Sequence, residues 1–200
     1  LELAAAFGVD AILVIPGAVG VDFVPGSAVI DYEVAYERAQ EGIRKLVPYA
    51  ESAGVAIAIE NVWNKFLLSP LELRTFIDEI GSDYVGSYFD VGNVVHSGYP
   101  EHWIRILGSR IKKVHFKDYR RQAGGLHGFV DLLAGDVDYP AVVEALKGIG
   151  YDNYVTAEMI PAYKHYSDQI IFNTSNAMDA ILGRTPPLRQ TAVREQLGQS

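Results

Sequence analysis

The sequence predicts an α/β fold, a parallel β-barrel surrounded by helices, from three observations. Helical patterns alternate with short apolar runs, and this alternation indicates a parallel sheet. The run VAIAI is continuously apolar, as expected for a strand covered on both faces. Four runs end on a residue that can bind a metal ion: VAIAIE at Glu60, YVGSYFD at Asp90, IKKVH at His115 and YVTAE at Glu158. Parallel barrel strands end on one face, where such folds carry their active sites.

The N-terminal residues predict the end of a helix followed by a first strand. Residues 1–7 match the end of a helix, Gly8 its C-terminal stop, and residues 10–15 a buried strand. Because a domain rarely begins inside a helix, we expect further sequence before Leu1. Five strand units cannot close a barrel of eight. The predicted fold is therefore a (β/α)8 barrel that lacks its first two to three units in this chain.

Three helices follow from periodicity and capping signals. Residues 31–53 place apolar side chains at spacings of three and four, and Gly54 ends this helix. The sequence Ser-Pro-Leu-Glu over residues 69–72 begins the next helix, with a capping serine and a proline at the first position. Residues 100–107 form a short third helix before the strand that ends at His115.

The C-terminal part predicts a long loop, two helices and a tail. Residues 119–138 are rich in glycine, and loops of this length are uncommon in compact domains unless they are functional. Helices are predicted over residues 139–149 and 167–182. Residues 184–200 are polar and form the predicted tail. The barrel domain is accordingly placed at residues 1–183.

Composition excludes several classes of function. The 200 residues suit one domain, and the net charge of −8 with a pI near 5.1 argues against a nucleic-acid partner. No apolar run approaches the roughly 18 residues of a membrane span, so no membrane partner is predicted. Cysteine is absent, which excludes disulfides and thiolate chemistry. A chain without cysteine fits a reducing compartment, and we expect a cytoplasmic location.

The four strand-end residues predict a site for one divalent metal ion. A buried carboxylate is costly unless it is paired or bound to a metal. Any one of these residues alone could instead cap a helix or pair with an arginine, but four in equivalent places favour a shared ion. Three carboxylates and one imidazole suit Mn²⁺ first, with Mg²⁺, Co²⁺ and Zn²⁺ as alternatives. The ion would stabilise an enediolate, while Glu60 and Glu158 could remove and return a proton.

The chain resembles the xylose-isomerase-like TIM barrel superfamily of sugar and sugar-phosphate isomerases and epimerases. The resemblance lies in four stretches: AIEN with Glu60, FDVGN with Asp90, KVHFKD with His115, and GDVDYPAVVEALKGIGYDNYVTAE with Glu158. It implies a (β/α)8 fold and one divalent metal held by these four residues. It also implies that Glu60 and Glu158 form the catalytic acid–base pair of the ketose 3-epimerases in the family.

The sequence departs from the family pattern at three places that bear on the substrate. Asn93 stands three residues after Asp90, where many members carry a substrate-contacting histidine, and His96 lies nearby as a substitute. Arg120 and Arg121 lie near the place of an arginine that holds a substrate hydroxyl or phosphate. Residues 15–17 lack the histidine that some relatives have at the tip of the first strand.

Further side chains are candidates for substrate contact, each with a structural alternative. Lys117 follows His115 by two and points to the same side of the strand, where it could neutralise an oxyanion or pair with an aspartate. Trp63 could wall the pocket or serve packing alone. Asn61 could orient a metal ligand, and a solvated loop position is the simpler explanation for His127. The predicted substrate-binding set is His96, Lys117, Arg120, Asn93 and Trp63.

The leading functional prediction is a metal-dependent isomerase or epimerase of a ketose or ketose phosphate. A dehydratase of the inosose or dehydroshikimate type would use the same metal and proton abstraction and then expel water, with His96 or His127 as its acid. A non-catalytic barrel that binds a polyol is a third alternative. The expected partner is a small-molecule sugar or sugar phosphate, and the expected assembly is a homodimer or homotetramer.

Overall fold

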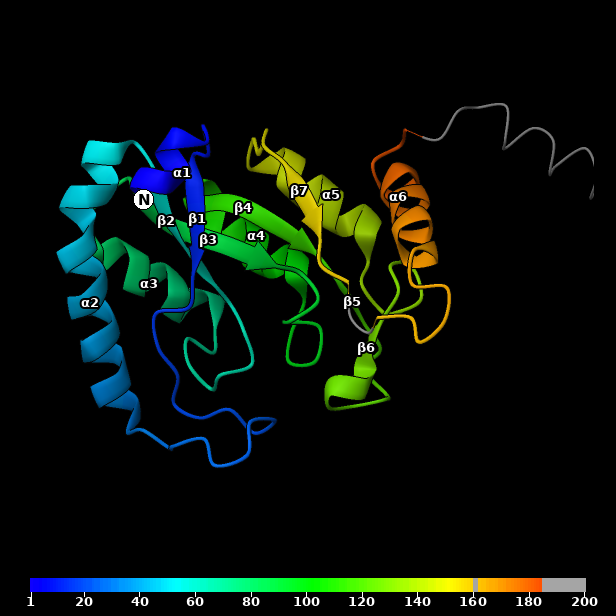
Figure 1. The fold of residues 1–200 in the computed structure, drawn as a ribbon, viewed down its shortest axis with the longest axis horizontal. Coiled ribbons are helices and arrows are strands. Elements are labelled where there is room, and N and C mark those ends of the chain that lie inside the picture. The colour runs from blue at the N-terminus through cyan, green and yellow to red at the C-terminus, as the bar shows by residue number, and fades with distance from the viewer. Residues whose placement is uncertain (160–161, 185–200) are drawn as a thin grey trace, which may run out of the picture.

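Five parallel strands form one sheet in a computed structural model that describes residues 1–159 and 162–184 (Figure 1). Neighbouring strands follow one another along the chain, and every neighbouring pair is parallel. The predicted parallel α/β architecture is confirmed. The strands are, in order across the sheet, β1 (Ala11–Val14), β2 (Ala56–Glu60), β3 (Val85–Asp90), β4 (Ile111–Phe116) and β7 (Val155–Ala157).

The helices begin and end close to the positions that the sequence predicts. Asp31, Ser69 and Asp138 each cap a helix by accepting a hydrogen bond from a backbone N–H of its first turn. Gly54 and Gly81 end two helices in the left-handed conformation. The helices are α1 (Glu2–Ala6), α2 (Tyr32–Ala53), α3 (Pro70–Ile80), α4 (Pro100–Leu107), α5 (Tyr139–Gly148) and α6 (Gln169–Ile181), with 3₁₀ turns η1 (Gly108–Arg110) and η2 (Leu126–Gly128).

The two faces of the sheet have different partners. The outer face supplies large apolar side chains, such as Ile57, Phe89 and Phe116, to the main hydrophobic core shared with the helices. The inner face carries Ala58 and Tyr88 in a separate small cluster. Because side chains alternate along a strand, the inner face of β2 also presents Glu60. Polar residues of the strand ends are thus directed away from the helical layer.

A β-bulge sets the alignment of β3 and β4. Ser87 pairs with Ile111 but Tyr88 pairs with Lys113, so Lys112 is one extra residue in β4. Gly86 lies against this bulge, and a Cβ there would lie 2.4 Å from the Arg110 carbonyl oxygen and 2.6 Å from Cγ of Lys112. A side chain at position 86 has no room. Beyond the bulge Asp90 pairs with His115, so both side chains leave the sheet on its inner face.

Polar contacts across the inner face join a side chain of β4 to the residues that precede β1 and β7. Lys113 Nζ lies 2.6 Å from Asp10 Oδ1 and donates a 2.9 Å hydrogen bond to Asn153 Oδ1. Asn153 Nδ2 donates to Asp10 Oδ2 at 3.2 Å. Asp10 precedes β1 and Asn153 precedes β7, the two outer strands of the sheet. Contact between them shows that the sheet is curved, with its edges approaching at this end.

Replacing Asp10 with asparagine is expected to lower stability at neutral pH and to have less effect in acid. The hydrogen bond from Lys113 lowers the pKa of Asp10, so the carboxylate stabilises the fold above its unfolded pKa of about 3.9, and this contribution is lost as pH falls through the lower folded value. The Asp10 side chain is 61% exposed, so we expect at most about 1 kcal/mol. Urea unfolding at pH 7 and pH 2, with Lys113→Met completing a double-mutant cycle, measures the coupling. If Asp10→Asn lowers the free energy of unfolding as much at low pH as at pH 7, this prediction is contradicted.

The segment after β4 is more ordered than predicted. The sequence predicts only a loop over residues 119–138, whereas β5 (Asp118–Tyr119) and β6 (Phe129–Val130) pair as an antiparallel ribbon. Two-residue strands are too short to leave a periodic pattern in a sequence. The buried carboxylate of Asp118 organises this segment by accepting backbone N–H groups of Tyr119, Leu133, Gly135 and Val137.

Replacing Asp118 with alanine is expected to destabilise the protein by about 2–4 kcal/mol, because one buried and three partly buried N–H donors lose their acceptor. Chemical unfolding gives this difference, and hydrogen exchange should show lost protection at Leu133, Gly135 and Val137. Asp136→Ala in the same loop is the matched control, since Asp136 accepts one exposed bond from the Arg121 N–H. Equal effects of the two replacements would show that Asp118 has no special role in ordering the loop.

Among the residues that the structure describes, no helix combines the length and apolar character needed to span a membrane. The predicted tail over residues 184–200 lies outside the described residues except for Arg184.

Candidate metal centre

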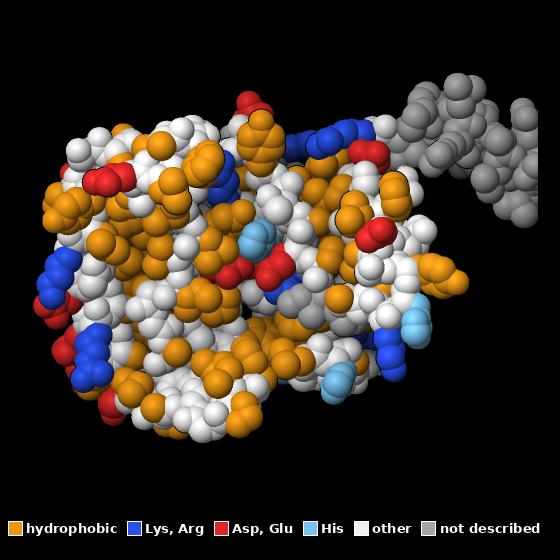
Figure 2. All heavy atoms as spheres, viewed as in Figure 1, with side chains coloured by type: hydrophobic (Ala, Val, Ile, Leu, Met, Phe, Trp, Pro, Cys, Tyr) orange, Lys and Arg blue, Asp and Glu red, His pale blue; other side chains and the backbone are white. Residues whose placement is uncertain are grey.

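Four side chains converge where their strands end. Glu60, Asp90, His115 and Glu158, here called the carboxylate–histidine cluster, each offer one ligand atom within 4.8 Å of the others. His115 Nδ1 lies 2.9 Å from Glu60 Oε1, 3.3 Å from Glu158 Oε2 and 3.9 Å from Asp90 Oδ2. Figure 2 shows acidic side chains and an imidazole gathered near the middle of this face, bordered by hydrophobic side chains.

Asparagine side chains fix the position of Asp90. Asn61 pairs with the Asp90 backbone, donating from Nδ2 to its carbonyl at 2.8 Å and accepting from its N–H at 2.9 Å. The Asn93 N–H donates to Asp90 Oδ1 at 2.8 Å, and Asn93 Nδ2 donates to the Asn61 carbonyl at 2.9 Å. Asp90 Oδ2 is buried and has no hydrogen-bond partner among the described residues. A buried carboxylate oxygen that accepts no hydrogen bond, with the Lys117 ammonium 3.4 Å away, fits a metal cation as a further partner.

The charges of the cluster also fit a divalent cation. Lys117 Nζ donates to Glu158 Oε2 at 2.9 Å and lies 3.4 Å from Asp90 Oδ2. Three carboxylates against one ammonium leave two negative charges when His115 is neutral. A divalent ion would balance this excess, and carboxylate oxygens with one imidazole are ordinary ligands for Mn²⁺, Mg²⁺ or Zn²⁺.

Burial and the close approach of charged groups also shift the pKa values of the cluster residues. Burial raises the pKa of Asp90 to about 7, against the lowering effect of Lys117. Burial alone would lower the pKa of His115, but hydrogen bonds to Glu158 and Glu60 outweigh it and raise the value to about 9. The hydrogen bond from His115 lowers the pKa of Glu158. Without a metal, therefore, a proton on His115 supplies part of the positive charge that the carboxylates require.

An apolar pocket of about 500 Å³ opens above the cluster. Its base includes Glu60, Lys117 and Glu158. Rings of Trp63 and Phe129 lie 5.0 Å apart in its wall. Side chains from the loop after β1 and from the loop after β5 complete it: Ile15, Ala18, Val21, Phe23 and Leu126. A polar, charged base under apolar walls is the usual composition of a small-molecule site.

The structure brings only part of the predicted substrate-binding set to this pocket. Trp63, Asn93 and Lys117 line it. His96 is exposed and lines a neighbouring cavity instead. Arg120 lines neither cavity, because its guanidinium donates to the Ala134 carbonyl at 2.6 Å. The structure therefore does not support substrate contact by Arg120.

Some pocket residues were not predicted as substrate contacts. Val21 and Phe23 lie in the loop after β1, and Leu126 and Phe129 lie in the segment after β5. Loop residues of this kind carry no pattern that identifies them in one sequence. The glycine richness of residues 119–138 was the one signal, and it marked the right segment without identifying the contacts.

The fold and the cluster together define a class of protein, in which a curved parallel sheet of the α/β-barrel type carries a candidate divalent-metal site at the C-terminal ends of its strands. Residues 1–175 match the family described as xylose isomerase-like TIM barrel, so the chain belongs to this family. An inosose dehydratase from Lacticaseibacillus casei is 26% identical over 140 residues, which cover 62% of this chain and 46% of that protein. The uncharacterized protein MJ1311 from Methanocaldococcus jannaschii is 29% identical over 122 residues, covering 58% of this chain and 41% of that protein.

Solved structures with similar folds confirm the TIM-barrel architecture. An IolI protein with a bound zinc atom has a TM-score of 0.75 and 20% identity, covering 92% of this chain and 66% of that chain. D-psicose 3-epimerase from Clostridium cellulolyticum H10, solved with D-tagatose, has a TM-score of 0.71 and 18% identity, covering 90% of this chain and 66% of that chain. The chain spans less than half the length of the two curated relatives and about two thirds of these solved chains.

Proposed function

We propose that the protein is a divalent-metal-dependent isomerase or epimerase that moves a proton on the carbon beside the carbonyl of a ketose or ketose phosphate. The observation that carries the proposal is the convergence of four ligand atoms within 4.8 Å beneath an apolar pocket. Two observations support a metal there: Asp90 Oδ2 accepts no hydrogen bond among the described residues, and the carboxylates outnumber the nearby ammonium. Mn²⁺ is the proposed ion, and the zinc atom of the IolI structure keeps Zn²⁺ as an alternative.

A bound cation would supply a Lewis acid that polarises the substrate carbonyl and stabilises the negative charge that develops on its oxygens. Glu60 and Glu158 provide the proton-transfer groups. They reach the pocket from β2 and from the end of β7, which are not neighbours in the sheet. One carboxylate would remove the proton and the other would return one on the opposite side of the carbon. The Glu158 side chain is 39% exposed and that of Glu60 is 7% exposed, so Glu158 has the easier proton exchange with water.

Lys117 is proposed to hold Glu158 in place and to limit repulsion among the carboxylates. Its ammonium contacts Glu158 and Asp90 and lies 4.8 Å from the centre of the Phe129 ring. It is 6% exposed at its side chain. A buried ammonium of this kind favours the ionised form of the carboxylates that it contacts. Ionised Glu158 is the form that a proton-accepting role requires.

A dehydratase is the second candidate, because the chain shares 26% identity with an inosose dehydratase over 62% of its length. The first step would be the same proton removal, and loss of water from the neighbouring carbon would follow. The acid could not be His96 acting from the base of the pocket, since this residue lies outside it. A lyase would form an unsaturated ketone, which absorbs in the ultraviolet and which an epimerase does not form.

Proton–deuterium exchange tests the proposed function directly. The protein is incubated in D₂O with Mn²⁺ and a panel of ketoses, ketose phosphates and inososes, and deuterium at the carbon beside the carbonyl is followed by NMR. Exchange that depends on both protein and Mn²⁺ supports the proposal. An unsaturated ketone shows the lyase instead. A protein that binds Mn²⁺ at the cluster but exchanges no proton on any member of the panel contradicts both enzymatic functions.

A further inference from the structure

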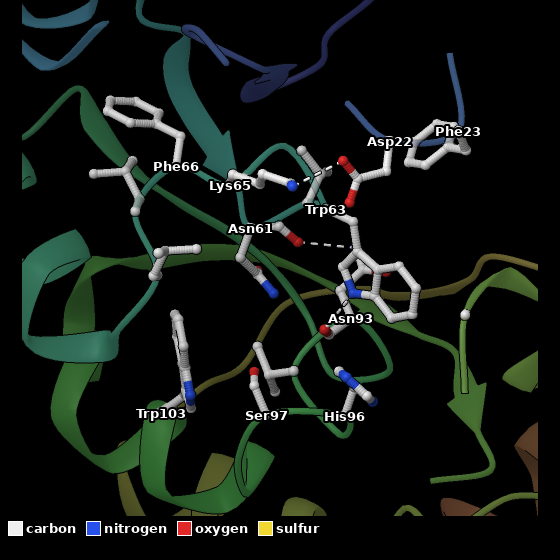
Figure 3. Close-up of a pocket in the computed structure, with 15 residues that line it drawn as sticks. Asp22, Phe23, Asn61, Trp63, Lys65, Phe66, Asn93, His96, Ser97 and Trp103 are labelled. Atoms are coloured by element: carbon white, nitrogen blue, oxygen red, sulfur yellow. Dashed lines mark hydrogen bonds and ion pairs between the residues drawn. The ribbon is translucent and has the colours of Figure 1, made fainter. Parts of the chain in front are cut away.

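A second cavity, of about 370 Å³, adjoins the pocket above the carboxylate–histidine cluster. The two spaces share Phe23, Val62, Trp63 and Asn93 as lining residues. Trp63 is fixed in this shared wall by a 2.8 Å hydrogen bond from Nε1 to the Asn93 carbonyl, and Figure 3 shows its indole beside Asn93. The second cavity therefore shares part of its wall with the candidate reaction site.

The lining of the second cavity combines an apolar interior with a polar rim. Phe66, Val94 and Trp103 are buried side chains of the interior. The rim carries the ion pair between Lys65 and Asp22, at 2.8 Å (Figure 3). Exposed His96 and Ser97 add further hydrogen-bonding groups. A sugar ring matches this composition, because its C–H face packs on aromatic rings while its hydroxyl groups reach polar partners.

The backbone around this cavity is held in an unfavourable conformation. Lys65 and Leu67 line the cavity with φ angles of 58° and 55°, values that non-glycine residues rarely adopt. Tertiary hydrogen bonds maintain this shape: the Leu67 N–H donates to the Tyr32 hydroxyl at 3.1 Å, and the Leu68 N–H donates to Glu72 Oε2 at 2.8 Å. Strained backbone that the surrounding structure holds in place is a feature of ligand-binding segments.

We propose that the second cavity binds a second sugar ring attached to the ketose that lies over the metal centre. The substrate would then be a keto-disaccharide, with its reacting ring in the first pocket and its other ring beyond Trp63. This inference rests on the proposed function and deepens it by naming the size and chemistry of the substrate. The pocket of about 500 Å³ serves the reacting ring, which leaves the further space of about 370 Å³ for the attached one.

Intrinsic fluorescence can test the proposal, because the chain contains two tryptophans and both Trp63 and Trp103 line the second cavity. The Mn²⁺-loaded protein is titrated with lactulose, a fructose unit that carries a galactose ring, and separately with fructose. We expect lactulose to bind at least tenfold more tightly and to change the emission more strongly at saturation. Equal dissociation constants for the two sugars would overturn the proposal.

Filling the cavity gives the decisive comparison. Ser97→Phe should remove the advantage of lactulose, bringing its dissociation constant within twofold of that for fructose, while fructose binding is unchanged. Ser52→Phe, at an exposed position of α2, is the matched control. If Ser97→Phe fails to fold by circular dichroism, Leu68→Tyr fills the same cavity from an exposed position. A lactulose preference that survives filling would overturn the proposal.

The result can be separated from a failure of the proposed function. Deuterium exchange is measured on both sugars alongside the titrations. Tight lactulose binding that is lost in Ser97→Phe, without exchange on lactulose or on any member of the panel of ketoses, ketose phosphates and inososes, would support the second ring site and reject the isomerase chemistry. Exchange on fructose and lactulose with equal affinities would support the chemistry and reject the second ring site.

Discussion

Replacing Glu158 with glutamine is expected to reduce turnover on any exchanging substrate by roughly 10²–10⁴-fold, the usual contribution of a positioned acid or base. Glutamine keeps an oxygen that can face a cation but cannot accept the substrate proton. The measurement is the rate of deuterium exchange at saturating Mn²⁺. Saturation ensures that a lower rate reflects lost proton transfer and not weaker metal binding. Metal content by elemental analysis accompanies each rate.

Glu144→Gln is the matched control for this variant, since Glu144 is exposed on α5. It should retain wild-type activity. Full activity in Glu158→Gln, with a normal metal content, would remove Glu158 from the acid–base pair. Equal loss of metal and activity would instead limit its role to ligation.

Replacing His115 with alanine is expected to weaken Mn²⁺ binding by more than the roughly 10–100-fold that loss of an outer-sphere partner costs. The imidazole is the sole nitrogen donor of the cluster, and it contacts Glu60 and Glu158. Isothermal titration calorimetry gives the affinity, and elemental analysis gives the retained metal. His102→Ala, at an exposed position on α4, is the control and should bind metal normally.

The wild-type protein and His115→Ala should differ in how their Mn²⁺ affinity depends on pH. The two glutamates raise the pKa of His115 to about 9 against the opposing effect of burial, so a proton occupies the imidazole at pH 7 and must leave when a metal binds. The Mn²⁺ affinity of the wild-type protein should therefore rise between pH 6.5 and pH 8 more steeply than that of His115→Ala.

Unchanged metal content in His115→Ala would refute ligation by this residue.

Much of the fold was predictable because its determinants are local. Caps such as Asp31 and Ser69, stops such as Gly54 and Gly81, and continuous apolar runs each act within a few residues. The positions of the carboxylate–histidine cluster were predictable for a related reason. A parallel sheet brings the ends of its strands to one edge, so residue type at the strand ends was sufficient. Their roles as metal ligands and catalytic groups remain predictions.

The substrate pocket was harder to predict because its walls come from loops. Phe23 and Phe129 reach the pocket through irregular segments whose course depends on contacts far away in sequence. The clearest example of such a distant contact is Asp118, whose carboxylate accepts four backbone N–H groups, the last of them from Val137. Arg120 was proposed as a substrate contact from its place in the sequence, and in the structure its guanidinium donates to the Ala134 carbonyl.

The register that follows the extra residue in β4 has a consequence for how this protein can change. Deleting Val114 would shift the rest of the strand by one position, and Phe116 would then stand opposite Asp90 in place of His115. The imidazole would turn toward the helices and an apolar side chain would face three carboxylates. Chain length is therefore constrained at this point as strictly as residue identity. A lineage could lose the ligand set through one lost codon while every ligand residue is still encoded.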